Sequence, residues 1–161
     1  MTDKITVLGV GNILLQDEGV GVRVVEEMIR RFAFPENVEV LDGGTLGMEL
    51  MRFLLGTDKL IIIDAIDGSL PPGSIYEFEK ENVKKYFREK VSVHDLGIQD
   101  VLASLDVLEK PLKELVVVGV QPAVIDVGLD LTPVVAPAVK TVIDKVLALL
   151  SAWKVEVTPH E

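Results

Sequence analysis

The sequence contains no cysteine among its 161 residues, and only 5% of these residues are aromatic. The absence of cysteine excludes disulfides, thiolate zinc sites, iron–sulfur clusters and a cysteine nucleophile, and it is consistent with a reducing compartment. Because 48% of the residues are hydrophobic and few are aromatic, aliphatic side chains must build the core. The length predicts one domain with a substantial core.

Basic residues are also scarce, because 16 lysines and arginines accompany 26 aspartates and glutamates, for a net charge of −10. Such a chain lacks the basic face that binds nucleic acids or anionic membranes, so neither partner is expected. The sequence contains no run of about 18 apolar residues, so no transmembrane helix is predicted. The first residues, Met1 to Lys4, do not resemble a signal peptide. We therefore expect a cytoplasmic protein.

Short aliphatic segments alternate with longer amphipathic ones along the chain. This order predicts a three-layer α/β fold. Its mostly parallel, twisted sheet is expected to be covered by helices on both faces. Residues 1–161 are expected to form a single domain, with 154–161 as a loose tail. Strands are predicted at 5–10, 38–41, 60–63, 75–78 (an edge strand) and 115–120; helices are predicted at 20–32, from Thr45 onward, at 98–108, and from Thr132 or Pro137 to Trp153.

Candidate functional residues follow the predicted strands, where ligands bind in open parallel sheets. Glu18, Asp42 and Asp64 follow the first, second and third strands, and His94 precedes a predicted helix. Two carboxylates and an imidazole, from Glu18, Asp64 and His94, suit a borderline divalent metal ion and leave positions open for substrate or water. Such a site requires Glu18 and Asp64 to be partly accessible and close to His94. Each residue also has a structural interpretation: a helix-dipole contact, a capped strand end and a helix-entry residue.

Other chemistries are less compatible with the sequence. Gly9 and Gly11 with Asp42 resemble part of a dinucleotide-binding fingerprint, but Leu14 occupies the position of the third glycine. Asp17 and Glu18 would also repel a phosphate at the start of the following helix. The sequence contains neither the HExxH motif of zincins nor the GxSxG motif of serine hydrolases. His160 lies in the predicted tail and is expected to be inert.

Several strings resemble those of the hydrogenase maturation endopeptidases when they are taken together. They occur in order over nearly the whole chain, so the combination is more specific than any one string. The matching strings are Gly9–Leu15 with Asp17–Gly21, Asp42–Thr45, Asp64–Ala65, His94–Gly97, Gly119–Pro122 and Leu131–Pro133.

This resemblance implies a nickel-dependent endopeptidase that removes the C-terminal peptide of a nickel–iron hydrogenase large-subunit precursor after nickel insertion. It implies that Glu18, Asp64 and His94 bind the metal and act in catalysis, and that the turn Asp42-Gly43-Gly44 recognises the substrate. Nickel would arrive with the precursor, and other divalent ions could occupy the empty site. The general base remains open, with Asp17 and Asp42 as the spare carboxylates.

Several alternatives also remain open from the sequence. One is a non-catalytic module that binds nickel or the precursor, and another is a nucleotide-binding α/β domain. The sequence does not distinguish an aspartyl-type from a metal-dependent peptidase, because nickel can serve either as a recognition element or as a Lewis acid.

Overall fold

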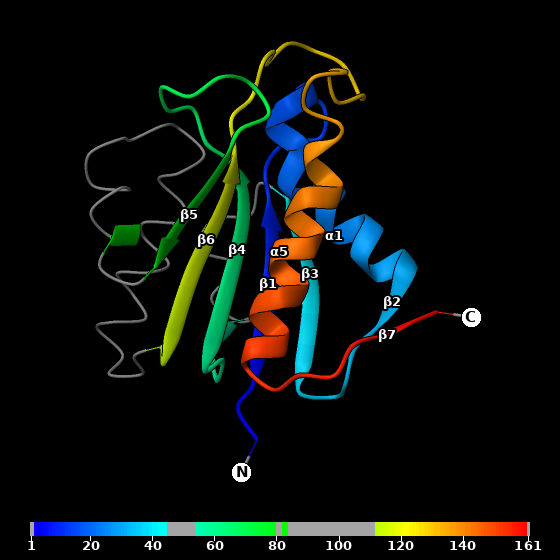
Figure 1. Ribbon diagram of the computed structural model, residues 1–161. Helices are drawn as coiled ribbons and strands as arrows, with labels where there is room; N and C mark the ends of the chain where they lie inside the picture. Colours follow the sequence, from blue (N-terminus) through cyan, green and yellow to red (C-terminus); the bar gives the residue numbers. More distant parts are fainter. Residues whose placement is uncertain (1, 45–53, 80–81, 84–111, 161) are drawn as a thin grey trace.

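The computed structural model describes residues 2–44, 54–79, 82–83 and 112–160 (Figure 1). It contains a five-stranded sheet with the order β3-β1-β4-β6-β5. Four strands are parallel, and the edge strand β5 runs antiparallel to β6. The predicted α/β class with a mostly parallel sheet is therefore confirmed. The strands of this sheet are β1 (Ile5–Val10), β3 (Val38–Gly44), β4 (Lys59–Ala65), β5 (Ile75–Glu79) and β6 (Glu114–Val120).

The three central strands, β1, β4 and β6, are almost entirely buried. Continuous runs of valine, isoleucine and leucine are typical of parallel strands that are covered on both faces. The strand predictions are confirmed apart from their ends. The largest difference is at Asp42, Gly43 and Gly44, which we predicted as a turn and which instead continue β3. Pairing with β1 extends this strand, and a register shift near Gly44, which has a φ of +51°, accommodates the glycines.

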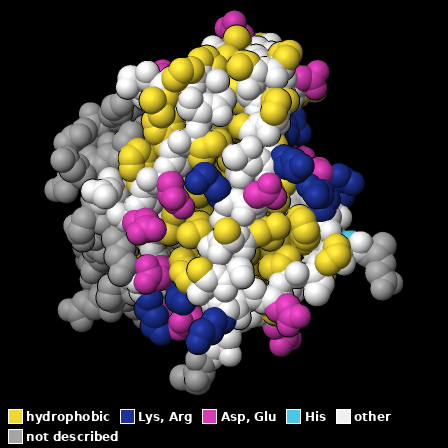
Figure 2. Space-filling view, viewed as in Figure 1, with side chains coloured by type: hydrophobic (Ala, Val, Ile, Leu, Met, Phe, Trp, Pro, Cys, Tyr) yellow, Lys and Arg dark blue, Asp and Glu magenta, His cyan; other side chains and the backbone are white. Residues whose placement is uncertain are grey.

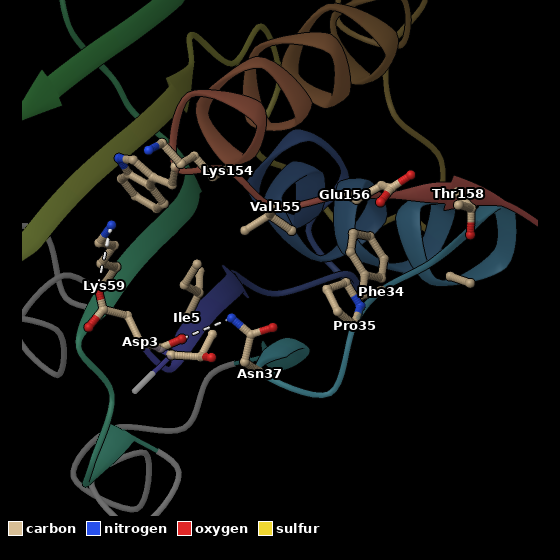
Figure 3. A pocket seen from close by; sticks show the side chains of 13 residues that line it. Asp3, Ile5, Phe34, Pro35, Asn37, Lys59, Lys154, Val155, Glu156 and Thr158 are labelled. Atoms are coloured by element: carbon tan, nitrogen blue, oxygen red, sulfur yellow. Dashed lines mark hydrogen bonds and ion pairs between the residues drawn. The ribbon is translucent and has the colours of Figure 1, made fainter.

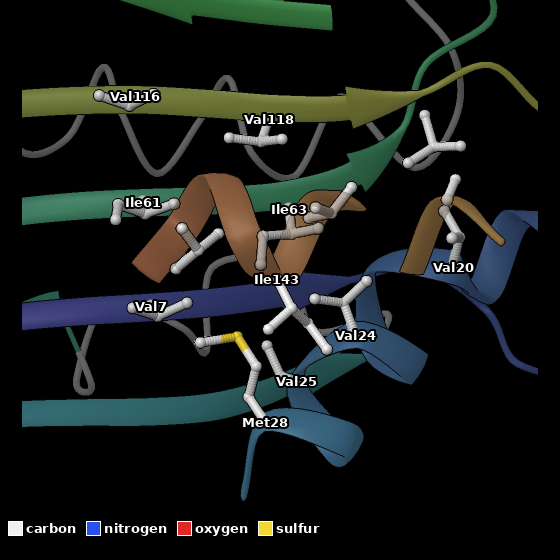
Figure 4. Close-up of a cluster of buried hydrophobic side chains, with 14 of the residues drawn as sticks. Val7, Val20, Val24, Val25, Met28, Ile61, Ile63, Val116, Val118 and Ile143 are labelled. Atoms are coloured by element: carbon white, nitrogen blue, oxygen red, sulfur yellow. The ribbon is translucent and has the colours of Figure 1, made fainter. Parts of the chain in front are cut away.

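Two helices, α1 (Val20–Arg31) and α5 (Ala138–Ala152), cover one face of the sheet. Figure 4 shows their side chains packed against those of β1, β4 and β6. Pro137 immediately precedes α5, which resolves the ambiguous start of the last predicted helix. The helices predicted after Thr45 and over 98–108 lie outside the described residues, so helices on the second face remain a prediction. The residues of the packed cluster that Figure 4 labels are Val7, Val20, Val24, Val25, Met28, Ile61, Ile63, Val116, Val118 and Ile143.

The C-terminal segment is not the loose tail that the sequence predicted. Strand β7 (Thr158–Pro159) pairs antiparallel with β2 (Phe32–Ala33), which directly follows α1. Val155 also packs against the core that α1 and α5 share with the sheet. The segment therefore closes the end of the core near β2. No helix within the part of the chain that the structure describes is long and apolar enough to cross a membrane.

Candidate active site

The carboxyl ends of β1, β4 and β6 form the sheet edge where the sequence predicts the chemistry. Gly9 of β1 pairs with Ile63 of β4, and Asp64 pairs with Gly119 of β6. The 3-10 helix η1 (Gln16–Gly19), which carries Glu18, contacts β4. Glu18 and Asp64 therefore come from two elements that lie side by side at this edge.

Two glycines explain how η1 comes so close to the sheet. A Cβ atom at Gly21 would lie 2.1 Å from the carbonyl oxygen of Ile63, and one at Gly9 would lie 2.3 Å from the carbonyl oxygen of Gly21. No larger residue fits either position unless the backbone moves. Helix α1 therefore begins in direct backbone contact with β1 and β4. This contact holds Glu18, three residues before Gly21, at the end of β4.

The two predicted carboxylates are both removed from solvent. Glu18 is 9% exposed, and Asp64 is fully buried. Oδ1 of Asp64 accepts a hydrogen bond of 2.8 Å from the backbone N–H of Ala65. The expectation of partial accessibility is wrong for Asp64, because this residue still belongs to β4, between β1 and β6. A carboxylate is costly to bury, so acids in such positions are often functional.

The third predicted metal ligand, His94, lies outside the residues that the structure describes. Within the described ranges, no group of three or more histidine, aspartate or glutamate side chains is arranged to hold a metal ion. Glu18 and Asp64 alone supply fewer donors than a divalent ion requires. A metal ion at this edge therefore needs further donors, from His94, from a bound substrate or from water.

Asp17 anchors the long segment between β6 and α5. Its Oδ2 accepts hydrogen bonds from the backbone N–H groups of Ala123 at 2.9 Å and Val124 at 3.0 Å, and from the hydroxyl of Thr132 at 2.8 Å. Its Oδ1 accepts one from the backbone N–H of Thr132 at 2.8 Å. Burial acts to raise the pKa of Asp17, but the hydrogen bonds from Thr132, Val124 and Ala123 outweigh it and lower the pKa below its ordinary value. Asp17 is therefore a structural anion, although the sequence also allows it as a general base.

The backbone around η1 offers no phosphate cradle. The N–H of Gln16 donates to the carbonyl of Gly128 at 3.0 Å, and the N–H of Asp17 donates to that of Val124 at 3.3 Å. The N–H of Leu15 donates to the carbonyl of Asn12 at 3.1 Å. A dinucleotide site uses N–H groups in this position to bind pyrophosphate, and here they are engaged. The structure therefore agrees with the sequence argument against nucleotide binding.

The predicted substrate-recognition residues lie on the outer strand of the same edge. Asp42 of β3 pairs with Gly9 of β1, and its side chain is exposed. The carbonyl oxygen of Gly44 accepts a hydrogen bond of 2.8 Å from the N–H of Gly11. Asp42 and Asp64 thus flank β1, with Gly43 buried between Asp42 and Gly44 in the chain.

A second polar network, whose partners the sequence analysis did not predict, lies at the end of β6. The Oε1 atom of Gln121 accepts hydrogen bonds from the Tyr76 hydroxyl at 2.6 Å and the Gly68 N–H at 2.8 Å. Its Nε2 donates to Oδ1 of Asp67 at 3.0 Å. Gln121 thereby fixes the loop between β4 and β5 beside Asp64. A glutamine directly after a buried strand was the only sequence signal for this role.

A cavity of about 580 Å³ lies at the opposite end of the sheet and takes no part in this site (Figure 3). Ile5 and Lys59, the first residues of β1 and β4, line it. The Nζ atom of Lys59 lies 3.6 Å from Oδ2 of Asp3 and 5.2 Å from the centre of the Trp153 ring. These contacts join the C-terminal segment to the strand starts, so the cavity belongs to the structural closure of the core.

Comparisons with known proteins assign the chain to a family. The family described as hydrogenase maturation protease (HycI) matches residues 22–149. The hydrogenase 2 maturation protease of Escherichia coli (strain K12) is 43% identical over 159 residues, which cover 98% of this chain and 97% of that protein. The hydrogenase expression/formation protein HupD of Bradyrhizobium diazoefficiens is 43% identical over 158 residues, covering 97% and 82%.

Comparison with solved structures supports the same family assignment. The hydrogenase maturating endopeptidase HybD from E. coli has a TM-score of 0.94 and 43% identity, and the match covers 98% of each chain. The [NiFe] hydrogenase maturation protease HybD from Thermococcus kodakarensis has a TM-score of 0.77 and 27% identity, covering 91% of this chain and 98% of that one. The match over most of the chain confirms the resemblance. This chain belongs to the hydrogenase maturation protease family and is a hydrolase, an endopeptidase of hydrogenase maturation.

Proposed function

We propose that this protein removes the C-terminal peptide of a nickel–iron hydrogenase large-subunit precursor after nickel insertion, and that it recognises the nickel bound by the precursor. One observation carries this proposal within the family assignment. Two buried carboxylates, Glu18 and Asp64, are presented by adjoining elements at the sheet edge where parallel α/β proteins bind ligands.

The donor set is suited to an ion that the substrate brings. Glu18 and Asp64 supply oxygen donors, and His94 is proposed as the nitrogen donor, a combination that accepts nickel and other divalent ions. Three protein donors leave positions for ligands that the precursor retains. A shared ion would then hold the scissile bond in a fixed orientation, and it could polarise the carbonyl group or a water molecule.

Asp17 and Asp42, the other acids near this edge, have different proposed roles. The carboxylate of Asp17 accepts hydrogen bonds from Ala123, Val124 and Thr132, so its oxygens are occupied. Asp42 is exposed on the adjoining strand, which favours it as the general base or as a contact to the substrate. We propose that Asp42, Gly43 and Gly44 form the substrate-recognition segment. We also propose that the protein acts in the cytoplasm, as the composition predicts.

Substitutions of the three proposed ligands test this function. Glu18→Gln, Asp64→Asn and His94→Ala should each lower the rate of cleavage of nickel-loaded precursor by about 100-fold or more, as expected when a group that stabilises the transition state is lost. Asp144→Asn, an exposed acid on α5, is the matched control and should cleave at the wild-type rate. Circular dichroism confirms that each variant is folded. Complete cleavage by a folded His94→Ala variant would refute the proposed metal site.

A further inference from the structure

The segment between β6 and α5 exposes an unusual number of aliphatic side chains. Val127 is 91% exposed, Leu129 is 59% exposed, and Leu14, from the loop before η1, is 58% exposed. Val124 and Ile125 are exposed in the same segment. We call residues 122–131 the apolar loop, against which Leu14 lies. Figure 2 shows hydrophobic atoms gathered along the top of the molecule, where Figure 1 places this segment, with acidic side chains at the margin.

The apolar loop is held in place by hydrogen bonds to the loop before η1 and to η1 itself. The N–H of Gly128 donates to the carbonyl of Leu14 at 2.9 Å, and the N–H of Gln16 donates to the carbonyl of Gly128 at 3.0 Å. Asp17 receives the hydrogen bonds from Ala123 and Val124 that are described above. The aliphatic side chains thus stand on a fixed backbone, which lowers the conformational entropy lost when a partner binds.

This surface lies on elements that adjoin the candidate active site. The residue that anchors it, Asp17, directly precedes Glu18 in η1. The segment also begins at Pro122, directly after Gln121, whose side chain fixes the loop beside Asp64. The apolar loop is therefore hydrogen-bonded to η1, the element that carries the proposed ligand Glu18.

Charge indicates what kind of chain would fit. Asp126 and Asp130 are exposed between and beside the aliphatic residues, and the whole chain carries a net charge of −10. Arg23 donates to the carbonyl of Leu129 at 2.8 Å, and Glu26, 3.4 Å from it, offsets its charge. A segment with aliphatic side chains flanked by lysine or arginine would match both the apolar contacts and the acidic margin.

We propose that the apolar loop is the docking surface for the large-subunit precursor, and that it binds an aliphatic segment with basic flanks near the scissile bond. This inference rests on the proposed function. The apolar area of the five side chains is on the order of a few hundred Å². That is less than the roughly 800 Å² per partner of a standard stable interface, so it suits a substrate that must be released better than a second copy of this chain.

A double substitution tests the docking surface. Val127 and Leu129 are both largely exposed, so the Val127→Ser/Leu129→Ser variant should retain the fold. The Kd for purified nickel-loaded precursor should rise at least ten-fold, and kcat/KM should fall equally through KM, with kcat retained. Ile29→Ser, an exposed aliphatic residue on α1, is the matched control and should bind and cleave as the wild type does.

The outcomes separate this inference from the proposed function. A double variant that binds the precursor with the wild-type Kd would overturn the docking surface, whether or not cleavage occurs. A wild-type protein that binds the precursor but does not cleave it would refute the proposed function. The docking surface would then be tested by comparing the Kd of the wild type with that of the double variant. Sedimentation velocity provides the other decisive result, because a wild-type dimer that dissociates in the double variant would show that a second copy covers the loop.

Discussion

Replacing Asp17 with asparagine keeps the size of the side chain and removes its charge and one acceptor. In the better of its two orientations, the amide oxygen still accepts from Ala123 and Val124, and the NH₂ group then faces the backbone N–H of Thr132. The hydrogen bond of Thr132 is partly buried, so leaving its N–H without an acceptor costs about 1–3 kcal/mol, and the remaining hydrogen bonds lose the contribution of the charge. We expect Asp17→Asn to lower the free energy of unfolding by about 3 kcal/mol.

For a chain of this size, that loss corresponds to a fall in Tm of about 6–12 °C. Urea and thermal unfolding, followed by circular dichroism, measure both quantities. Thr132→Val removes only the hydroxyl hydrogen bond to Asp17 and should cost about 1 kcal/mol. Asp126→Asn changes an exposed acid in the same segment and should stay within about 0.5 kcal/mol of the wild type.

The same substitution should also impair cleavage. The hydrogen bonds of Asp17 hold η1 against the segment between β6 and α5, and Glu18 is the next residue. Loosening this contact displaces the Glu18 carboxylate, and we expect cleavage at a temperature where the variant is folded to fall about ten-fold or more. A variant as stable and as active as the wild type would refute the assignment of Asp17 as the anchor.

Three further perturbations test other parts of the structure. Gly21→Ala places a Cβ atom 2.1 Å from the carbonyl oxygen of Ile63, so urea unfolding should show a loss of about 3 kcal/mol; an unchanged midpoint would contradict the close contact. Truncation after Trp153 removes Val155 and Val157, which pack against the core, and should lower stability by about 2 kcal/mol in the same assay. If the segment contributed nothing, the truncated and full-length chains would unfold together. Asp126→Asn combined with Asp130→Asn should reduce the salt dependence of precursor binding, whereas an identical salt dependence would argue against a basic partner segment.

The elements that the sequence predicts best are those whose fold depends on local pattern. The aliphatic runs at Ile5–Val10 and Glu114–Val120 are buried on both faces, so composition alone identifies them as central strands. The start of α5 was predicted less well, because Thr132 and Pro137 were both possible starts and only the structure selects Pro137. In the segment Asp42–Gly44 local pattern misled, because paired glycines usually indicate a turn, whereas pairing with β1 keeps them in a strand.

The features that the sequence did not predict depend on contacts between distant segments. Asp17 and Thr132 are 115 residues apart, and the pairing of Phe32 with Pro159 spans most of the chain. No periodicity or local spacing encodes such contacts, so the sequence presents Asp17 as a spare acid and predicts a loose C-terminal tail. The candidate ligands Glu18 and Asp64 could be identified because parallel strands bring their carboxyl ends to one edge, and the resemblance implies the same residues.

The central claim is that cleavage requires nickel already bound by the precursor. The most direct measurement is a time course of cleavage of nickel-loaded and nickel-free large-subunit precursor by the wild-type protein, with a chelator control and with free nickel added to the enzyme. We predict that only the loaded precursor is cut, and that free nickel added to the enzyme does not restore cleavage of the nickel-free precursor. Equal rates for the two precursors would contradict the account, and Glu18, Asp64 and His94 would then require a role other than recognition of the metal.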